Sequence, residues 1–186
     1  MTKLGTRWLL AILTVASSLR LFRLARHDAA NDEVFYGFRS VGLFDSLNAG
    51  DQPTPFDWFD PVPWWAHLSF HDHPPLGFWI MHLCMRVFGP DLVGMRIASA
   101  LAGIATVYLT YLVAKRLFGR EPVALLAAAL LAVNSAHVWF SRIGMQESLV
   151  IFFLMLAIWL FLKMLEDPRY FYGAVAATGI AMLMKY

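Results

Sequence analysis

The chain has 186 residues, of which 59% are hydrophobic and 15% are charged, and its mean hydropathy is +0.58. Soluble domains are about half apolar and about one quarter charged, so this composition excludes an ordinary soluble domain. The net charge of +2 points to no nucleic-acid partner, and the single cysteine, Cys84, excludes an internal disulfide. We therefore expect an all-α integral membrane protein that is surrounded by lipid.

The N-terminal segment predicts a first membrane span within residues 1–24. Lys3 and Arg7 flank the start of an apolar run from Trp8 to Leu19. A secretory signal peptide begins in the same way, but no small-residue cleavage site follows, because the next residues are Arg20-Leu-Phe-Arg-Leu. We therefore interpret this segment as an uncleaved span.

Residues 25–95 form a long segment that is rich in acidic and aromatic residues. Eight of the thirteen Asp and Glu residues lie between Asp28 and Asp72. Val34–Leu47 has apolar residues at near-helical spacing, and Leu76–Val87 is too short and too polar to span. Both patterns predict amphipathic helices in the membrane interface. We expect this segment to be an outer, periplasmic or extracellular, catalytic loop.

Residues 96–186 predict four further transmembrane helices, at Ile97–Ala114, Pro122–Phe140, Ser148–Leu162 and Tyr170–Met184. If Leu76–Val87 does not cross, the basic turns that follow Ala114 and Leu162 both face the cytoplasm, in agreement with the positive-inside rule. The sequence thus predicts a polytopic bundle of about five spans in the cell membrane, with a cytoplasmic N-terminus. Because the chain stops directly after its last span, we expect it to be the N-terminal part of a longer protein.

Charged residues gather at the predicted outer ends of these spans. They are the cations Arg20, Arg96, Arg142 and Lys185 and the acids Asp32, Glu33 and Glu147. Each has an ordinary explanation, since an acid can cap a helix, an arginine can extend to the headgroups and a pair can form a surface ion pair. Their convergence favours a site, in which cations suit the phosphate of a lipid-linked substrate and paired acids suit general-base catalysis.

His71 and His73 form an H-x-H pair, which could bind a metal ion, although the spacing provides no third ligand. The alternative is a turn that starts the interfacial helix, with proline at its first position. Asp32 and Glu147 are the other candidate ligands for a divalent metal ion. The sequence establishes neither a metal nor another cofactor.

In their order along the chain, these residues resemble a known family. The matching positions are Arg20-Leu21, Asp32-Glu33, His73–Leu76, Met95–Ile97, Leu117–Gly119, Ser141-Arg142, Glu147 and Lys185-Tyr186. This pattern is similar to that of the membrane-embedded glycosyltransferases of the GT-C fold. The nearer relatives are the protein O-mannosyltransferases and the aminoarabinose transferases that modify lipid A.

The resemblance implies an enzyme that transfers a sugar from a polyprenyl-phosphate donor to an acceptor glycan, lipid or protein on the outer face. It implies that Asp32 is the catalytic acidic residue, with Glu33 as its neighbour and Glu147 as a second acidic residue. The remaining candidates are assigned to substrate and phosphate binding: Arg20, His73, Arg96, Arg142 and Lys185. His73 occupies a position where the aminoarabinose transferases carry lysine.

Two other classes of protein fit the same pattern. A transporter or lipid flippase would line a pathway with charges, but it would place them near the middle of the bilayer rather than at its outer edge. An assembly subunit that keeps the fold without the activity is the second alternative. The expected partners in every case include membrane lipids.

Overall fold

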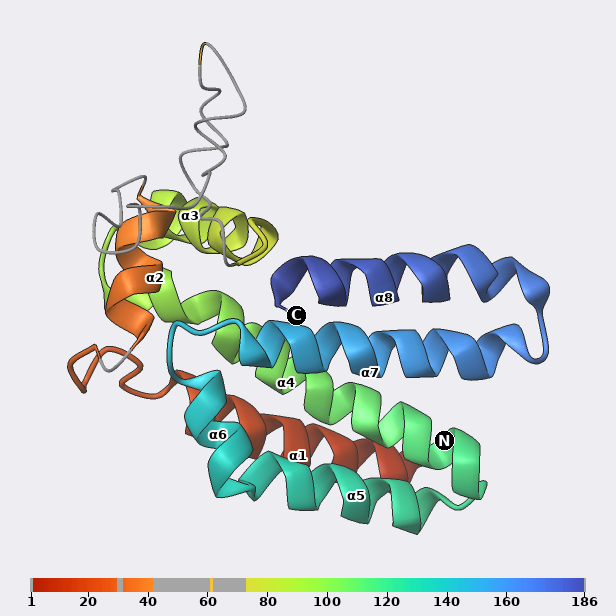
Figure 1. Cartoon of the computed structure of the whole chain (residues 1–186). Coiled ribbons are helices and arrows are strands. Elements are labelled where there is room, and N and C mark those ends of the chain that lie inside the picture. Colours follow the sequence, from red (N-terminus) through yellow and green to blue (C-terminus); the bar gives the residue numbers. More distant parts are fainter. Residues whose placement is uncertain (1, 30–31, 42–60, 62–72, 186) are drawn as a thin grey trace.

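The computed structural model describes residues 2–29, 32–41, 61 and 73–185 (Figure 1). Helices make up the regular structure of these residues, which confirms the predicted all-α class. The elements are α1 (Lys3–Leu21), α2 (Asp32–Ser40), α3 (Leu76–Phe88), α4 (Leu92–Phe118), α5 (Glu121–Val133), α6 (Ser135–Ser141), α7 (Glu147–Met164), the 3-10 helix η2 (Pro168–Tyr170) and α8 (Phe171–Met184).

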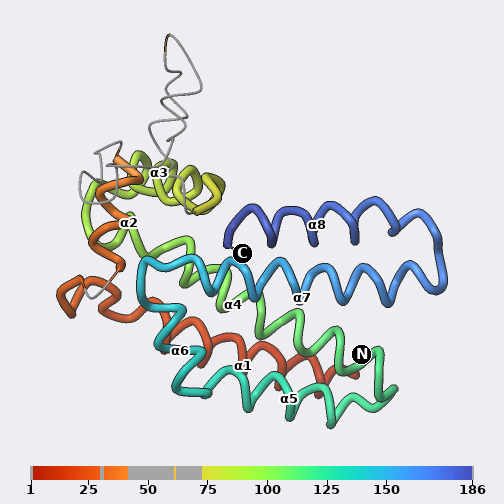
Figure 2. The backbone as a smooth tube through the Cα atoms, in the orientation of Figure 1, coloured from red at the N-terminus to blue at the C-terminus, as the bar shows by residue number. Residues whose placement is uncertain are grey.

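The long helices lie side by side and alternate in direction (Figure 2). Helices α1, α5 and α8 run in one direction, and α4 and α7 run antiparallel to them. Helices α2 and α3 lie at the end of the bundle where α4 and α7 begin, and the N- and C-termini lie at opposite ends (Figure 1). The outer ends predicted from the sequence are therefore gathered on one side of the bundle.

Within the described residues, three helices, α1, α4 and α7, are long and apolar enough to cross a membrane. Helices α5 and α6 form a fourth candidate if they are counted as one bent span. Helix α8 has 14 residues, so it is shorter than the roughly 17 that a span requires, and its role as a fifth span stays a prediction.

The segment predicted as one span over Pro122–Phe140 is broken, with a bend of 62° between α5 and α6. Asn134 causes the break, because its backbone is extended and its side chain accepts a hydrogen bond from the His137 amide at the start of α6. The carbonyl groups at the end of α5 then need other donors. Arg20 supplies them, with bonds of 3.0 Å to the Ala132 carbonyl and 3.4 Å to the Leu131 carbonyl.

Small residues bring the helices close together. Ala124, Ala128 and Ala132 recur every four residues along α5, are buried, and share a core with buried residues of α1 and α4. Helix α8 presents a similar buried row of alanines, and the pair α7–α8 is closely packed. Packing of this kind needs no hydrophobic driving force, so it suits helices in lipid.

The predicted amphipathic helix at Val34–Leu47 corresponds in part to α2, which covers Asp32–Ser40. Residues 42–47 lie outside the described part of the chain. Phe35 and Phe38 are exposed, whereas Tyr36 is buried against α3 in a core with Phe78. Helix α2 therefore faces the bundle with Tyr36 and presents its phenylalanines on the other side.

Candidate active site

The two acids at the start of α2 have opposite environments. Asp32 is exposed, whereas Glu33 is completely buried. Consecutive residues of a helix point about 100° apart, so two neighbouring side chains can differ in burial. The structure thus separates an acid at the protein surface from an acid that is enclosed by protein.

Glu33 is paired with Arg96 of α4. The Arg96 Nε and Nη2 atoms donate to the two Glu33 carboxylate oxygens at 2.6 and 2.8 Å. The other three N–H groups of Arg96 donate to the backbone carbonyls of Leu24, His27 and Asp28. All five guanidinium donors are therefore used, and Arg96 has none left for a phosphate.

Glu33 also accepts a hydrogen bond from the Gly144 amide, at 2.5 Å, in the connection between α6 and α7. Ser99 of α4 donates to the next carbonyl of that connection, that of Met145, at 2.9 Å. The connection leads directly into Glu147, the first residue of α7. The buried pair of Glu33 and Arg96 therefore links α2, α4 and the connection that leads into α7.

Glu147 lies beside Lys185, the residue that follows α8. The Lys185 ammonium donates to Glu147 Oε1 at 2.7 Å, and both side chains are partly exposed. Burial lowers the pKa of Lys185, but the hydrogen bond and charge of Glu147 outweigh it, so the net shift is upward. Lys185 is consequently a charged group that is fixed in place and still open to solvent.

Tyr36 completes this cluster, and our sequence reasoning missed it. Its hydroxyl lies 3.1 Å from His73 Nε2 and lies near the Lys185 ammonium. Burial raises the pKa of Tyr36, and the charges of Glu147 and Asp32 raise it further, while Lys185 opposes the change. The signal in the sequence was the spacing of Asp32 and Tyr36, which lie four residues apart and so share one face of α2.

The cluster contains Asp32, Tyr36, His73, Glu147 and Lys185, which we call the polar cluster. Among the described residues, no group of three or more His, Cys, Asp or Glu is close enough to hold a metal ion. The predicted H-x-H pair cannot be assessed, since His71 lies outside those residues. Metal binding by Asp32 and Glu147 therefore stays a prediction.

Two of the predicted phosphate-binding arginines, Arg20 and Arg142, bind backbone carbonyl groups, and their part in phosphate binding stays a prediction. Arg142 donates to the carbonyls of Leu19, Phe22 and Arg23, which closes the end of α1. Arg20 is fully buried, and besides its bonds to α5 it lies 2.7 Å from His137 Nδ1. It therefore does not reach out to the headgroups, and the structure does not bring it into the polar cluster.

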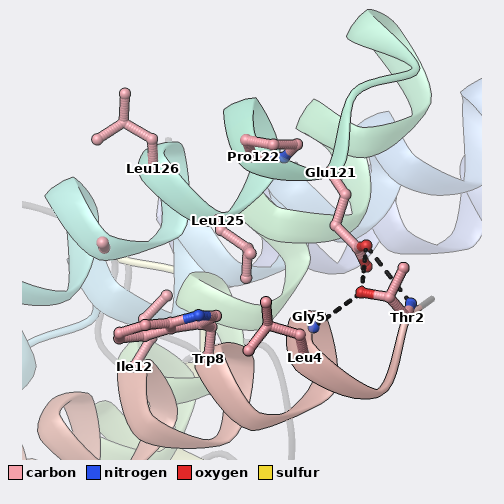
Figure 3. A pocket seen from close by; sticks show the side chains of 10 residues that line it. Thr2, Leu4, Gly5, Trp8, Ile12, Glu121, Pro122, Leu125 and Leu126 are labelled. Atoms are coloured by element: carbon pink, nitrogen blue, oxygen red, sulfur yellow. Dashed lines mark hydrogen bonds between the residues drawn. The ribbon is translucent and has the colours of Figure 1, made fainter.

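An apolar groove of about 550 Å³ lies at the opposite end of the bundle, between α1 and α5 (Figure 3). Trp8, Leu125 and Leu126 line it. Glu121 at its edge accepts hydrogen bonds from the hydroxyl and the amide of Thr2, at 3.1 and 3.4 Å. With its one acid engaged in this way, the groove offers an apolar surface to lipid and contrasts with the polar cluster.

Comparison with known proteins identifies the family of the chain. The sequence profile of the family described as "Dolichyl-phosphate-mannose-protein mannosyltransferase" matches residues 72–186, which is more than half of the chain. The chain belongs to this family. The mannosyltransferase family profile covers α3 to α8 and therefore includes His73, Glu147 and Lys185 of the polar cluster.

Individual relatives include three proteins of Pseudomonas that are named as undecaprenyl phosphate-alpha-4-amino-4-deoxy-L-arabinose arabinosyl transferases. The chain is 31% identical to one from P. fluorescens strain Pf0-1 over 64% of its length, and this covers 21% of that protein. It is 31% identical to another from P. fluorescens strain Pf-5 over 82% of its length, and this covers 25% of that protein. It is 43% identical to that of P. paraeruginosa over 40% of its length, which is 13% of that protein.

The chain thus spans about a quarter or less of the length of these curated relatives. No solved structure matches it.

Proposed function

We propose that this protein is a glycosyltransferase that moves a sugar from a polyprenyl-phosphate donor to an acceptor on the outer face of the membrane. The observation that carries the proposal is the polar cluster. An exposed acid, a fixed ammonium and a buried phenol come together from α2, from the start of α7 and from the end of α8. Membership of the mannosyltransferase family supports the same chemistry.

Asp32 is the proposed catalytic base in this reaction. Its carboxylate takes the proton of the acceptor hydroxyl as the acceptor oxygen attacks C1 of the sugar. The bond between C1 and the phosphate oxygen breaks, and the polyprenyl phosphate leaves with the electron pair. Asp32 suits this role because it is exposed, whereas its neighbour Glu33 is completely buried in a pair with Arg96.

Lys185 is the proposed partner of the leaving phosphate. Its ammonium has three donors, one of which is held by Glu147, and it is partly exposed. A fixed cation can stabilise the negative charge that develops on the leaving group. Arg96 was another of the predicted phosphate-binding residues, but its five donors are all engaged within the protein.

The proposal is tested by transfer of a labelled sugar from a polyprenyl-phosphate donor, measured with the full-length protein in proteoliposomes. The expected result is transfer that depends on Asp32, so that Asp32→Asn is defective. Asp167→Asn is the matched control, because Asp167 caps η2 at the other end of the bundle. A solute that crosses the bilayer while no donor is consumed would favour the transporter, and neither activity would favour the assembly subunit.

A further inference from the structure

Gln146 is a buried amide whose polar atoms have no hydrogen-bond partner among the residues that the structure describes. Its side chain is 1% exposed, and both Oε1 and Nε2 lack a hydrogen bond. Enclosed amides are normally hydrogen bonded, because leaving them unpaired costs their full desolvation. A leucine would fill similar space without that cost, so the amide at this position requires another explanation.

The surroundings of Gln146 place it beside the polar cluster. It directly precedes Glu147 and stands at the start of α7, where it makes no side-chain capping bond. The first turn of α3 packs against the Gln146 side chain. A Cβ atom added to Gly77 in this turn would lie only 2.7 Å from Gln146 Nε2. The glycine of α3 therefore leaves room for the amide between α3 and α7.

A neighbouring acceptor, Glu147 Oε2, also lacks a partner within the described part of the chain. Glu147 uses Oε1 for Lys185, while its Oε2 is buried and has no hydrogen bond. Together these residues offer one N–H donor group from Gln146 and two oxygen acceptors, one from each side chain. At neutral pH a phosphate offers hydrogen-bond acceptors but no donor, so it would leave both oxygens unpaired. A hydroxyl group, in contrast, both donates and accepts a hydrogen bond.

We propose that the Gln146 side chain, together with Glu147 Oε2, binds hydroxyl groups of the transferred sugar. The inference rests on the proposed function and adds to it a residue that recognises the sugar rather than the phosphate. Sites that hydrogen bond a substrate hydroxyl discriminate strongly, because an analogue without the hydroxyl leaves their polar groups unpaired. Gln146 is thus a specificity-determining residue beside the phosphate partner Lys185.

The test compares Gln146→Leu with the unmodified chain in lipid nanodiscs, using thermal unfolding as the readout. The probes are polyprenyl phosphate alone, polyprenyl-phosphate mannose and polyprenyl-phosphate aminoarabinose. Without a probe, Gln146→Leu should unfold at the same or a higher temperature, because it removes an unpaired buried amide. Gln146→Met, which keeps the unbranched shape, gives the same readout if leucine does not fit. Thr178→Val on α8 is the matched control, since its hydroxyl only bonds the Ala174 carbonyl.

With probes, the unmodified chain should be stabilised by all three and most by one of the two that carry a sugar. Gln146→Leu should keep the shift with polyprenyl phosphate alone and bind the sugar-bearing probe about 3- to 10-fold more weakly than the unmodified chain. Two results would overturn this inference and leave the proposed function standing. One is a sugar-dependent thermal shift that is unchanged in Gln146→Leu, and the other is a thermal shift of the unmodified chain that does not depend on the sugar. No shift with any probe would contradict the proposed function, and the inference with it.

Discussion

Removal of the charge from Glu33 tests how the candidate site is built. Glu33 is completely buried and bridges Arg96 of α4 and the Gly144 amide before α7. In Glu33→Gln the side chain keeps its shape, but its NH2 group faces one of the two Arg96 donors. The Arg96 guanidinium then carries a buried charge without a counter-ion.

The expected cost follows from this burial. Breaking a buried ion pair by removing one partner typically costs about 3–5 kcal/mol, because the other charge remains unpaired. An exposed ion pair contributes only about 0–1 kcal/mol. Glu166→Gln provides the matched control, since Glu166 pairs with Arg116 and its side chain is 63% exposed. The two variants carry the same chemical change and should differ in unfolding free energy by at least about 2 kcal/mol.

The measurement is reversible unfolding of the chain in detergent, followed by far-ultraviolet circular dichroism during a titration with SDS. The double variant Glu33→Gln/Arg96→Gln should lose about 0.5–3 kcal/mol less than the sum of the single variants, because it no longer leaves a charge unpaired. If Glu33→Gln costs no more than Glu166→Gln, the buried pair does not hold α2 and α4 together, and the reasoning is refuted.

Three further predictions concern the polar cluster, the pH dependence and the sidedness. Lys185→Met should weaken binding of polyprenyl phosphate by about tenfold, measured by thermal shift, through loss of a charge-assisted contact; equal binding would remove Lys185 from the site. Because the pKa of Lys185 is raised, its pair with Glu147 should stabilise the fold below the ordinary pKa of 10.5 and lose this contribution as the pH rises through the raised value. Lys185→Met should not show that loss, and a loss of equal size in both proteins would contradict the assignment. In a chain without its native cysteine, a cysteine introduced at Ser69 should react with an impermeant thiol reagent in intact cells, while one at Gly119 should not; labelling at Gly119 alone would reverse the sidedness.

The sequence predicted the elements that depend on local pattern. Apolar runs of spanning length became α1, α4 and α7, and the ends that were predicted to be outer meet at one end of the bundle. The break at Asn134 was not predicted, because the segment carries no Asp, Glu, Lys or Arg residue and a single asparagine does not mark a bend. What holds the bend is Arg20, a contact over 111 residues that no local pattern contains.

The roles of neighbouring charges could not be read from their order. Asp32 and Glu33 are adjacent in the sequence, and only the packing of α2 shows which of them is buried. The cations were grouped by depth in the membrane, but depth does not reveal that Arg96 and Arg142 bind carbonyl groups. Tyr36 was missed because an aromatic residue on an interfacial helix is ordinarily an anchor in the membrane.

The most direct test of the proposed site compares the neighbouring variants Asp32→Asn and Glu33→Gln in the transfer of labelled sugar from a polyprenyl-phosphate donor. Rates are measured with the full-length protein and divided by the folded fraction. Asp32→Asn should fold as the unmodified protein does and lose about 10²–10⁴ in rate, since it lacks the general base. Glu33→Gln should lose stability but keep most of its rate per folded molecule. A normal rate for Asp32→Asn, together with inactive but fully folded Glu33→Gln, would contradict the account.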